Sequence, residues 1–316
     1  MLTRRELLLA LGAAWMYGCG TDAPAPAVDP APLNPEATFH RIYRDPELRE
    51  RFFPFLQNIF HLYPPDKLHD LIHRAAEAHG TDEAIYRAIA KDLPTITPVG
   101  SMATFALPAL RKQKQVMAAQ AEQLLASRNR FDGYLEMGTT GRYVRPLRRR
   151  LELTGPVYLL NDAAPGRTPV DLVERGQLAK AGTFLDLGRY EPLDNRVPKG
   201  TIGLISNFIG LHHCPLPQLD AFIDSLRRVL RPDGVLLLRE HDVTDPTMDT
   251  IAALAHDVFN AGTDATWSAN QAEIRHFRSV ADWQTRLEAH GFRREDGALR
   301  QEGDPTRNVL LRFGVG

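Results

Sequence analysis

The sequence has little cysteine, no excess of charge of one sign and no long hydrophobic run. Its two cysteines, Cys19 and Cys214, lie far apart in 316 residues, which argues against a disulfide scaffold. Lysine and arginine number 38 against 39 aspartates and glutamates, so a general attraction to polyanions is not expected. The short basic run at 148–150 is assigned to a solvated helix face. Nucleic acid is therefore not a predicted partner.

The first twenty residues differ from the rest of the chain. They contain a twin arginine in "TRRELLLA", a short apolar run and then Cys19. This pattern resembles the twin-arginine export signal, whose machinery moves folded proteins, and the apolar run is too short for a stable membrane span. We expect residues 1–20 to be an export signal and the protein to be exported, or anchored to a membrane so that it faces the periplasm.

Cys19 is a candidate site for lipidation. "MYGC" partly resembles a lipoprotein processing site, although Met16 stands where leucine is usual. Simple cleavage nearby is the alternative, as is a start codon assigned too early, which would leave the protein cytoplasmic. Residues 21–37 carry five prolines and cannot form a regular helix, so we expect an extended tether beside the candidate lipid anchor.

Residues 38–128 are predicted to form an all-helical cap of roughly four helices. Apolar side chains recur at three- and four-residue spacing, and "YPPD", "HGTDE" and "LPTITPVGS" separate the helices. The aromatic side chains of this region either line an apolar acceptor pocket or form plain core, and core is the expected role. These residues are Phe52, Phe53, Phe55, Phe60 and Tyr63.

From residue 129 to 316 the pattern changes to alternating strands and helices. Apolar segments such as "VYLL", "IGLIS" and "GVLLLRE" alternate with the helix candidates "RYVRPLRRRLEL", "PVDLVERGQ" and "PQLDAFIDSLRRVL". This alternation indicates a parallel sheet covered on both faces, and "FRRED" and "NVLLRF" are predicted to close it as an antiparallel hairpin. The predicted fold class is α/β: a doubly wound, Rossmann-like, mostly parallel sheet with an N-terminal all-helical region.

"YLEMGTTG" falls at the end of the first predicted strand, where an open parallel sheet binds its ligands. Gly138 and Gly141 permit a tight turn and a close approach of a ligand to the backbone. Asp162 closes the second strand, where a carboxylate can accept hydrogen bonds from both ribose hydroxyls of a nucleoside. The alternatives are a turn-capping role for Asp162 and a solvated edge position for Glu136.

Together, "YLEMGTTG", "VYLLND", "AGTF", "IGLISNFIGLHH" and "LRRVLRPDGVLLLREHD" resemble the class I S-adenosylmethionine-dependent methyltransferases, over roughly residues 130–245. The resemblance implies S-adenosyl-L-methionine as cofactor and a small-molecule acceptor as substrate. Three departures from the family pattern are Glu136, where aspartate is more frequent, Thr140, where glycine is frequent, and "SNF" at 206–208, where many members have an aspartate.

The resemblance also implies a set of cofactor contacts. Glu136 would lie near the methionine part, Asp162 would bind the ribose, and Asn207 would lie beside the transferable methyl group. The turn residues Gly138, Thr139 and Gly141 would line the cofactor. Thr183 and Phe184 would flank the adenine.

Methyl transfer from a sulfonium needs alignment and exclusion of water, and a base only when the acceptor must lose a proton. His213 and His241 are the candidate bases, and Asp242 is expected to support His241. The alternative is a packing or capping role for either histidine. His256, Asp257 and His276 match no known ligand spacing, so no metal is predicted. Cys214 is expected to be a small buried residue.

Three other functions are compatible with parts of the sequence. A related enzyme would cyclise or transfer the aminobutyrate chain of the same cofactor, and a nicotinamide-dependent dehydrogenase would share the nucleoside site. An exported binding protein that has lost activity gains support from the signal, because S-adenosylmethionine is made in the cytoplasm. Nothing in the sequence predicts an oligomeric state.

Overall fold

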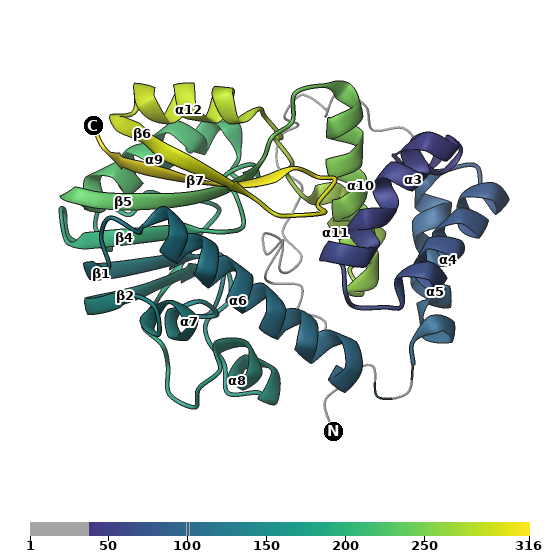
Figure 1. Cartoon of the computed structure of the whole chain (residues 1–316), viewed down its shortest axis with the longest axis horizontal. Helices are drawn as coiled ribbons and strands as arrows, with labels where there is room; N and C mark the ends of the chain where they lie inside the picture. The colour runs from purple at the N-terminus through teal and green to yellow at the C-terminus, as the bar shows by residue number, and fades with distance from the viewer. Residues whose placement is uncertain (1–37, 99, 101) are drawn as a thin grey trace.

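The computed structural model describes residues 38–98, 100 and 102–316, so the expected signal and tether lie outside the described residues. A seven-stranded sheet with its helices forms one part of the molecule, and a helical lobe packs beside it (Figure 1). The strands are β1 (Arg130–Met137), β2 (Glu152–Asn161), β3 (Thr183–Asp186), β4 (Ile202–Asn207), β5 (Leu230–His241), β6 (Phe292–Arg300) and β7 (Asn308–Val315).

The strand order is β3-β2-β1-β4-β5-β7-β6, with β1 to β5 parallel and the last two antiparallel. Apolar side chains cover both faces of the central strands, as an internal parallel sheet requires. One face packs against α9 (Leu216–Val229) and α12 (Val280–Ala289), and the other against α6 (Leu107–Leu124) and α7 (Val144–Arg148). The predicted fold class and its closing hairpin are confirmed.

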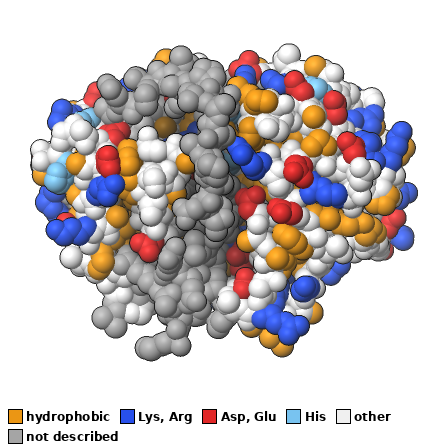
Figure 2. Space-filling view, turned by 180° about the vertical axis from the view of Figure 1, so that it is seen from behind, with side chains coloured by type: hydrophobic (Ala, Val, Ile, Leu, Met, Phe, Trp, Pro, Cys, Tyr) orange, Lys and Arg blue, Asp and Glu red, His pale blue; other side chains and the backbone are white. Residues whose placement is uncertain are grey.

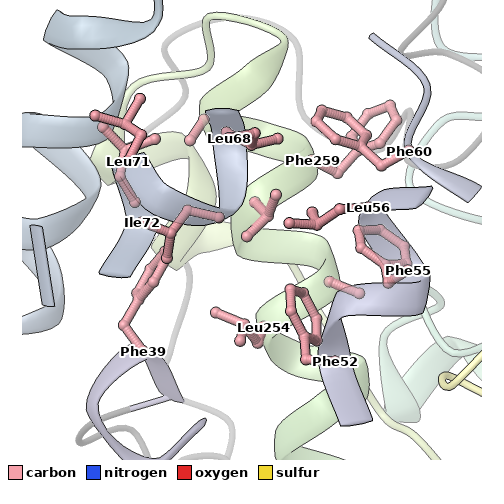
Figure 3. Close-up of a cluster of buried hydrophobic side chains, with 14 of the residues drawn as sticks. Phe39, Phe52, Phe55, Leu56, Phe60, Leu68, Leu71, Ile72, Leu254 and Phe259 are labelled. Atoms are coloured by element: carbon pink, nitrogen blue, oxygen red, sulfur yellow. The ribbon is translucent and has the colours of Figure 1, made fainter. Parts of the chain in front are cut away.

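The helical lobe combines N-terminal helices with two helices from the C-terminal half. Its members are α2 (Thr38–Tyr43), α3 (Pro46–Pro54), η1 (Phe55–Ile59), α4 (Pro65–Ala78), α5 (Asp82–Ile96), α10 (Pro246–Gly262) and α11 (Trp267–Ala272). Asp45 begins α3 by accepting hydrogen bonds from the Glu47 and Leu48 amides, and Thr81 begins α5 in the same way. Buried side chains of α10 complete the core formed by Phe52, Phe55 and Phe60 (Figure 3).

The lobe's aromatic side chains therefore form core, which was the expected role. Phe52, Phe55, Phe60 and Tyr63 are all buried, and Phe53 packs against the same cluster. The boundary of the lobe falls within α6, because Leu110 packs in the lobe whereas Met117, Ala118, Ala121 and Leu124 pack on the sheet. The apolar stripe of an amphipathic helix shows that one face is buried. It does not show which part of the protein that face packs against.

The segment 142–153 was predicted to form one helix, but most of it is not helical. Only α7 is helical there, and β2 begins at Glu152 instead of Val157. Pairing of Glu152 with Arg130 extends the sheet into this region, so tertiary contact overrides the local helical pattern. A short helix, α8 (Pro169–Arg175), follows β2 as predicted.

Acidic and basic side chains are interspersed over the described surface of the face in Figure 2, in keeping with a net charge of −1. Among the described residues, the helices are too short or too polar to cross a membrane.

Candidate functional site

The carboxyl ends of the parallel strands meet at one edge of the sheet. Met137 ends β1 beside Leu160 of β2 and Asn207 of β4, and Asn161 pairs with Asp186 at the end of β3. His241 ends β5 at the same edge. Residues from four separate sequence motifs are thereby brought together, as a nucleotide-binding site in an open parallel sheet requires.

Glu136 holds the turn after β1 in place. Its buried carboxylate accepts hydrogen bonds from the Tyr134 hydroxyl at 3.0 Å, from the Tyr143 amide at 3.2 Å and from the Thr139 hydroxyl. Burial raises the pKa of Glu136, and these donors oppose the rise. Glu136 is therefore a buried support of the turn and not a solvated edge residue.

The two glycines of this turn have left-handed backbone angles, with φ of 76° at Gly138 and 103° at Gly141. A Cβ added at Gly138 would lie 2.3 Å from Cδ1 of Ile209, and one at Gly141 would lie 2.6 Å from the Ala181 Cβ. Both positions therefore require glycine for the turn and for packing against the protein itself. Their expected contact with the cofactor stays a prediction.

Asp162 lies directly after β2 with one carboxylate oxygen, Oδ2, buried and without a hydrogen-bond partner among the described residues. Burial raises the pKa of Asp162 to about 6, and the neighbouring Asp186 carboxylate adds to the rise. An unpartnered buried carboxylate is costly unless a ligand supplies donors. The two hydroxyls of a ribose are such donors.

Three further buried polar atoms at the ends of β1, β2 and β4 lack partners within the described part of the chain. They are the Thr140 hydroxyl, in the turn after β1, Asn161 Oδ1, at the end of β2, and Asn207 Nδ2, at the end of β4. Asn207 Oδ1 accepts from the Ile209 and Gly210 amides at 3.3 and 3.1 Å, so the side chain is fixed with its amide nitrogen left over. Together with Asp162, these atoms offer a nucleoside amino acid two acceptors and two donors, which fits such a ligand.

Thr183 and Phe184 do not reach this edge. They begin β3 and pair with Tyr158 and Leu159, whereas Asp186 ends the strand. Their expected adenine contacts stay a prediction, and such a contact would have to come from within the strand, because only the last residues of a parallel strand lie at its carboxyl end. Asp186 and Leu187 occupy that position.

His241 is buried, and its Nδ1 lies 2.9 Å from the Thr306 carbonyl oxygen. Burial lowers the pKa of His241 to about 4. Asp242 does not support it, because the Asp242 carboxylate accepts from Arg300 at 2.9 Å and from the Val280 amide at 3.1 Å. This corrects the expected cluster: side chains of successive residues in extended chain point in opposite directions.

The histidine that does have a carboxylate partner is His212. Its Nδ1 lies 2.7 Å from Oε2 of Glu240, whose other oxygen accepts from the Leu211 amide. Burial raises the pKa of Glu240 to about 8 and lowers that of His212. The sequence placed a base at His213, whose Nδ1 lies 2.9 Å from the Ile274 carbonyl oxygen and 3.6 Å from Glu273 Oε1.

His256, in α10, joins this group from the helical lobe. Its ring centroid lies 5.5 Å from that of His212 and 5.3 Å from that of His241. Sequence reasoning missed this proximity because residues 212, 241 and 256 belong to a loop, a strand and a distant helix. Asp257 instead pairs with Arg275 at 2.7 Å, and Cys214 is buried as expected, with its thiol pKa raised to about 12 by burial.

A family profile described as "Methyltransferase domain" matches residues 109–295. Among curated proteins, none matches the sequence. One similar solved structure is the 1,6-didemethyltoxoflavin-N1-methyltransferase of Burkholderia thailandensis, 12% identical, with a TM-score of 0.45 over 64% of this chain and 78% of that one.

Two other solved structures are similar to the same extent. An O-methyltransferase family protein from Burkholderia thailandensis is 15% identical, with a TM-score of 0.43 over 77% of this chain and 62% of that one. An S-adenosylmethionine-dependent methyltransferase from Mesorhizobium loti is 12% identical, with a TM-score of 0.42 over 61% of this chain and 95% of that one.

Proposed function

Since the chain belongs to the methyltransferase-domain family, whose profile covers residues 109–295, we propose that it methylates a small molecule. The enzyme is a class I S-adenosylmethionine-dependent methyltransferase, and S-adenosylmethionine is its cofactor. When bound, this cofactor supplies a methyl group activated by the positive charge of the sulfonium. The observation that carries the proposed site is the buried, unpartnered carboxylate oxygen of Asp162 at the sheet edge.

The chain's own residues would hold the cofactor as follows. Asp162 accepts hydrogen bonds from the ribose, and the amide nitrogen of Asn207 donates to a carboxylate or hydroxyl oxygen. The turn of Gly138, Thr139 and Gly141 gives the ligand backbone contacts. Glu136 fixes that turn by accepting hydrogen bonds from the Thr139 hydroxyl and the Tyr143 amide. Asp186 lies at the end of β3 and is a candidate contact for the adenine.

The acceptor would lie where the ends of β4 and β5 face the helical lobe. His241 and His213, the proposed bases, lie there with His212, and all three are buried. Burial excludes water, which protects an activated methyl group from hydrolysis. An acceptor hydroxyl, thiol or ammonium would lose its proton to an imidazole nitrogen in this group.

The first test is cofactor binding. S-adenosylhomocysteine is titrated by calorimetry into the purified chain, into Asp162→Ala and into Asp220→Ala, a surface control on α9. Loss of a hydrogen bond to a charged group costs about 1.5–3 kcal/mol, so Asp162→Ala should bind roughly 10- to 150-fold more weakly. Equal affinity in all three proteins would contradict the proposed ribose contact.

The second test identifies the group that is transferred. Labelled S-adenosylmethionine is incubated with the enzyme and a panel of phenols, thiols and amines. A methyltransferase yields S-adenosylhomocysteine and a labelled acceptor, whereas transfer or cyclisation of the aminobutyrate chain yields methylthioadenosine. Formation of methylthioadenosine alone would refute methyl transfer. His213→Gln and His241→Gln, assayed on the acceptor found, test the proposed bases through the loss of kcat at unchanged cofactor affinity.

We also propose that the protein is exported or anchored to the membrane. The support is the twin arginine of "TRRELLLA" and Cys19, both outside the described residues. Cell fractionation should find the wild-type chain with membranes or periplasm, and a variant with lysines in place of Arg4 and Arg5 should remain in the cytoplasm. A wild-type protein found wholly in the cytoplasm with an intact N-terminus would overturn this proposal.

A further inference from the structure

Three buried imidazoles from separate elements face one another where the sheet meets the helical lobe. His212 follows β4, His241 ends β5 and His256 lies in α10, and each is no more than 4% exposed. Their ring centroids lie 5.3–5.5 Å apart, and one ring nitrogen of each lies within 4.8 Å of the other two. We propose that these three histidines bind one divalent transition-metal ion of the zinc type.

The second nitrogen of each ring already has a protein partner. Nδ1 of His241 lies 2.9 Å from the Thr306 carbonyl oxygen, and Nδ1 of His256 lies 2.9 Å from the Ala252 carbonyl oxygen. A carbonyl oxygen only accepts, so these contacts hold the proton on Nδ1 and leave a lone pair on Nε2. Metal-binding histidines are oriented in this way by carbonyl or carboxylate acceptors.

His212 has the carboxylate version of the same arrangement. Glu240 Oε2 lies 2.7 Å from its Nδ1, and Nε2 is buried without a hydrogen-bond partner among the described residues. With the proton held on Nδ1 in each ring, every imidazole keeps one nitrogen lone pair, and a cation that accepts all three would satisfy them. A cation therefore explains the arrangement better than packing alone, although the Phe277 ring lies 5.0–5.3 Å from all three imidazoles.

The chemistry of the three ligands selects the metal. Imidazole nitrogen suits Zn²⁺, Cu²⁺, Fe²⁺ and Ni²⁺, and three histidines with a fourth open position are typical of catalytic zinc. Zinc–nitrogen bonds of about 2.0–2.1 Å place tetrahedral ligand atoms about 3.4 Å apart. From a separation of at most 4.8 Å, the nitrogens would have to close by up to about 1.4 Å. Side-chain rotation can supply that movement.

A second possible group shares His256 and adds His213 and Glu273. It is the weaker candidate, because Glu273 already pairs with Arg275 at 2.7 Å and accepts from Asn260 at 2.8 Å. The two groups can be distinguished by which histidine variants lose metal binding. His213 matters only to the second, and His212 and His241 matter only to the first.

An ion in the first group would lie beside the ends of β4 and β5, where the acceptor is proposed to bind. Its fourth position would be open to a hydroxyl or thiol, and a bound metal lowers the pKa of such a group. His241 would then act as a ligand and not as a base, which leaves His213 as the proposed base. Metal binding itself does not depend on methyl transfer. Its test therefore remains valid if the proposed acceptor class is wrong.

The experiment measures metal in the full chain. The protein is stripped with a chelator, mixed with Zn²⁺ or Co²⁺, desalted and analysed for metal content and for the visible absorption of cobalt. We expect one zinc per chain, a higher Tm with zinc, and a cobalt spectrum typical of nitrogen ligands in a tetrahedral site. A wild-type chain that keeps no metal, or whose Tm and cobalt spectrum do not change, would overturn the proposal.

Variants then assign the ligands. His212→Gln and His241→Gln should each weaken zinc binding at least 100-fold, and Glu240→Gln should weaken it 10- to 100-fold because the carboxylate only orients His212. His213→Gln and the surface variant His290→Gln should bind zinc as the wild type does. Loss with His213→Gln and retention with His212→Gln would move the ion to the second group and refute this assignment. Circular dichroism of each stripped variant separates ligand loss from misfolding.

Discussion

At the level of single residues, burial sets the charge of Asp162 and thereby the pH dependence of cofactor binding. Its pKa is raised to about 6 by burial and by the nearby Asp186, and the ionised carboxylate accepts from the two ribose hydroxyls more strongly than the protonated acid does. The affinity should therefore rise with pH through about 6, gaining about tenfold between pH 5 and 7. Calorimetric titration of S-adenosylhomocysteine across this range measures the effect, and Asp162→Asn should bind weakly with no such step. A flat profile for the wild type would contradict the expected ribose contact.

Gly138 is the residue where a single methyl group should do most damage to the turn. Gly138→Ala forces a side chain onto a φ of 76° and places Cβ 2.3 Å from Ile209 Cδ1. We expect a loss of about 1–3 kcal/mol in the free energy of unfolding, measured by urea titration. Gly200→Ala is the matched control, because Gly200 has a φ of 66° but nothing within 4 Å of the added Cβ. Equal losses in the two variants would show that backbone strain alone, without the Ile209 contact, accounts for the effect.

At the level of elements, α10 is the helix that the lobe is built around. Leu254 is fully buried there among side chains of the N-terminal helices (Figure 3). Leu254→Ala should lower the free energy of unfolding by about 2–5 kcal/mol, since it leaves a cavity in close-packed core. Leu178→Ala makes the same chemical change at a side chain that is 83% exposed, and should stay within about 0.5 kcal/mol of the wild type. If the two variants lost equal stability, α10 would not belong to the core of the lobe.

At the level of the whole molecule, the two parts should unfold together. The chain leaves the sheet at β5, forms α10 and α11, and returns through a bridge between Asp242 and Arg278 to α12. Trp267 in α11 reports on the lobe and Trp283 in α12 on the sheet, so two single-tryptophan variants, each also lacking Trp15, can follow them separately. Their fluorescence transitions in urea should coincide within error. Two separated midpoints would show instead that the lobe unfolds as an independent unit.

A site residue could be predicted where the sequence immediately around it indicates a strand or a turn, and could not where its position depends on distant parts of the chain. Glu136 lies near the end of β1, and Gly138 and Asp162 directly follow β1 and β2, whose apolar runs are visible in the sequence, so their common edge followed from the rule for parallel sheets. The position of Thr183 and Phe184 at the start of β3 did not follow from the sequence, because this strand is only four residues long and its end could not be located. The proximity of His256 to His212 and His241 was not predicted, because the sequence of α10 carries no signal for contact with the ends of β4 and β5.

The sequence by itself determined the α/β class, the order of the motifs and the hairpin that closes the sheet. Those features follow from hydrophobic periodicity and turn residues, which act over a few positions. Only the tertiary structure decided that α6 belongs to the sheet, that α10 completes the lobe and that three histidines meet. The physical reason is that the hydrophobic effect is non-directional. The sequence shows that an apolar stripe or a neutral imidazole is suited to burial, but only the folded chain determines which residues cover it.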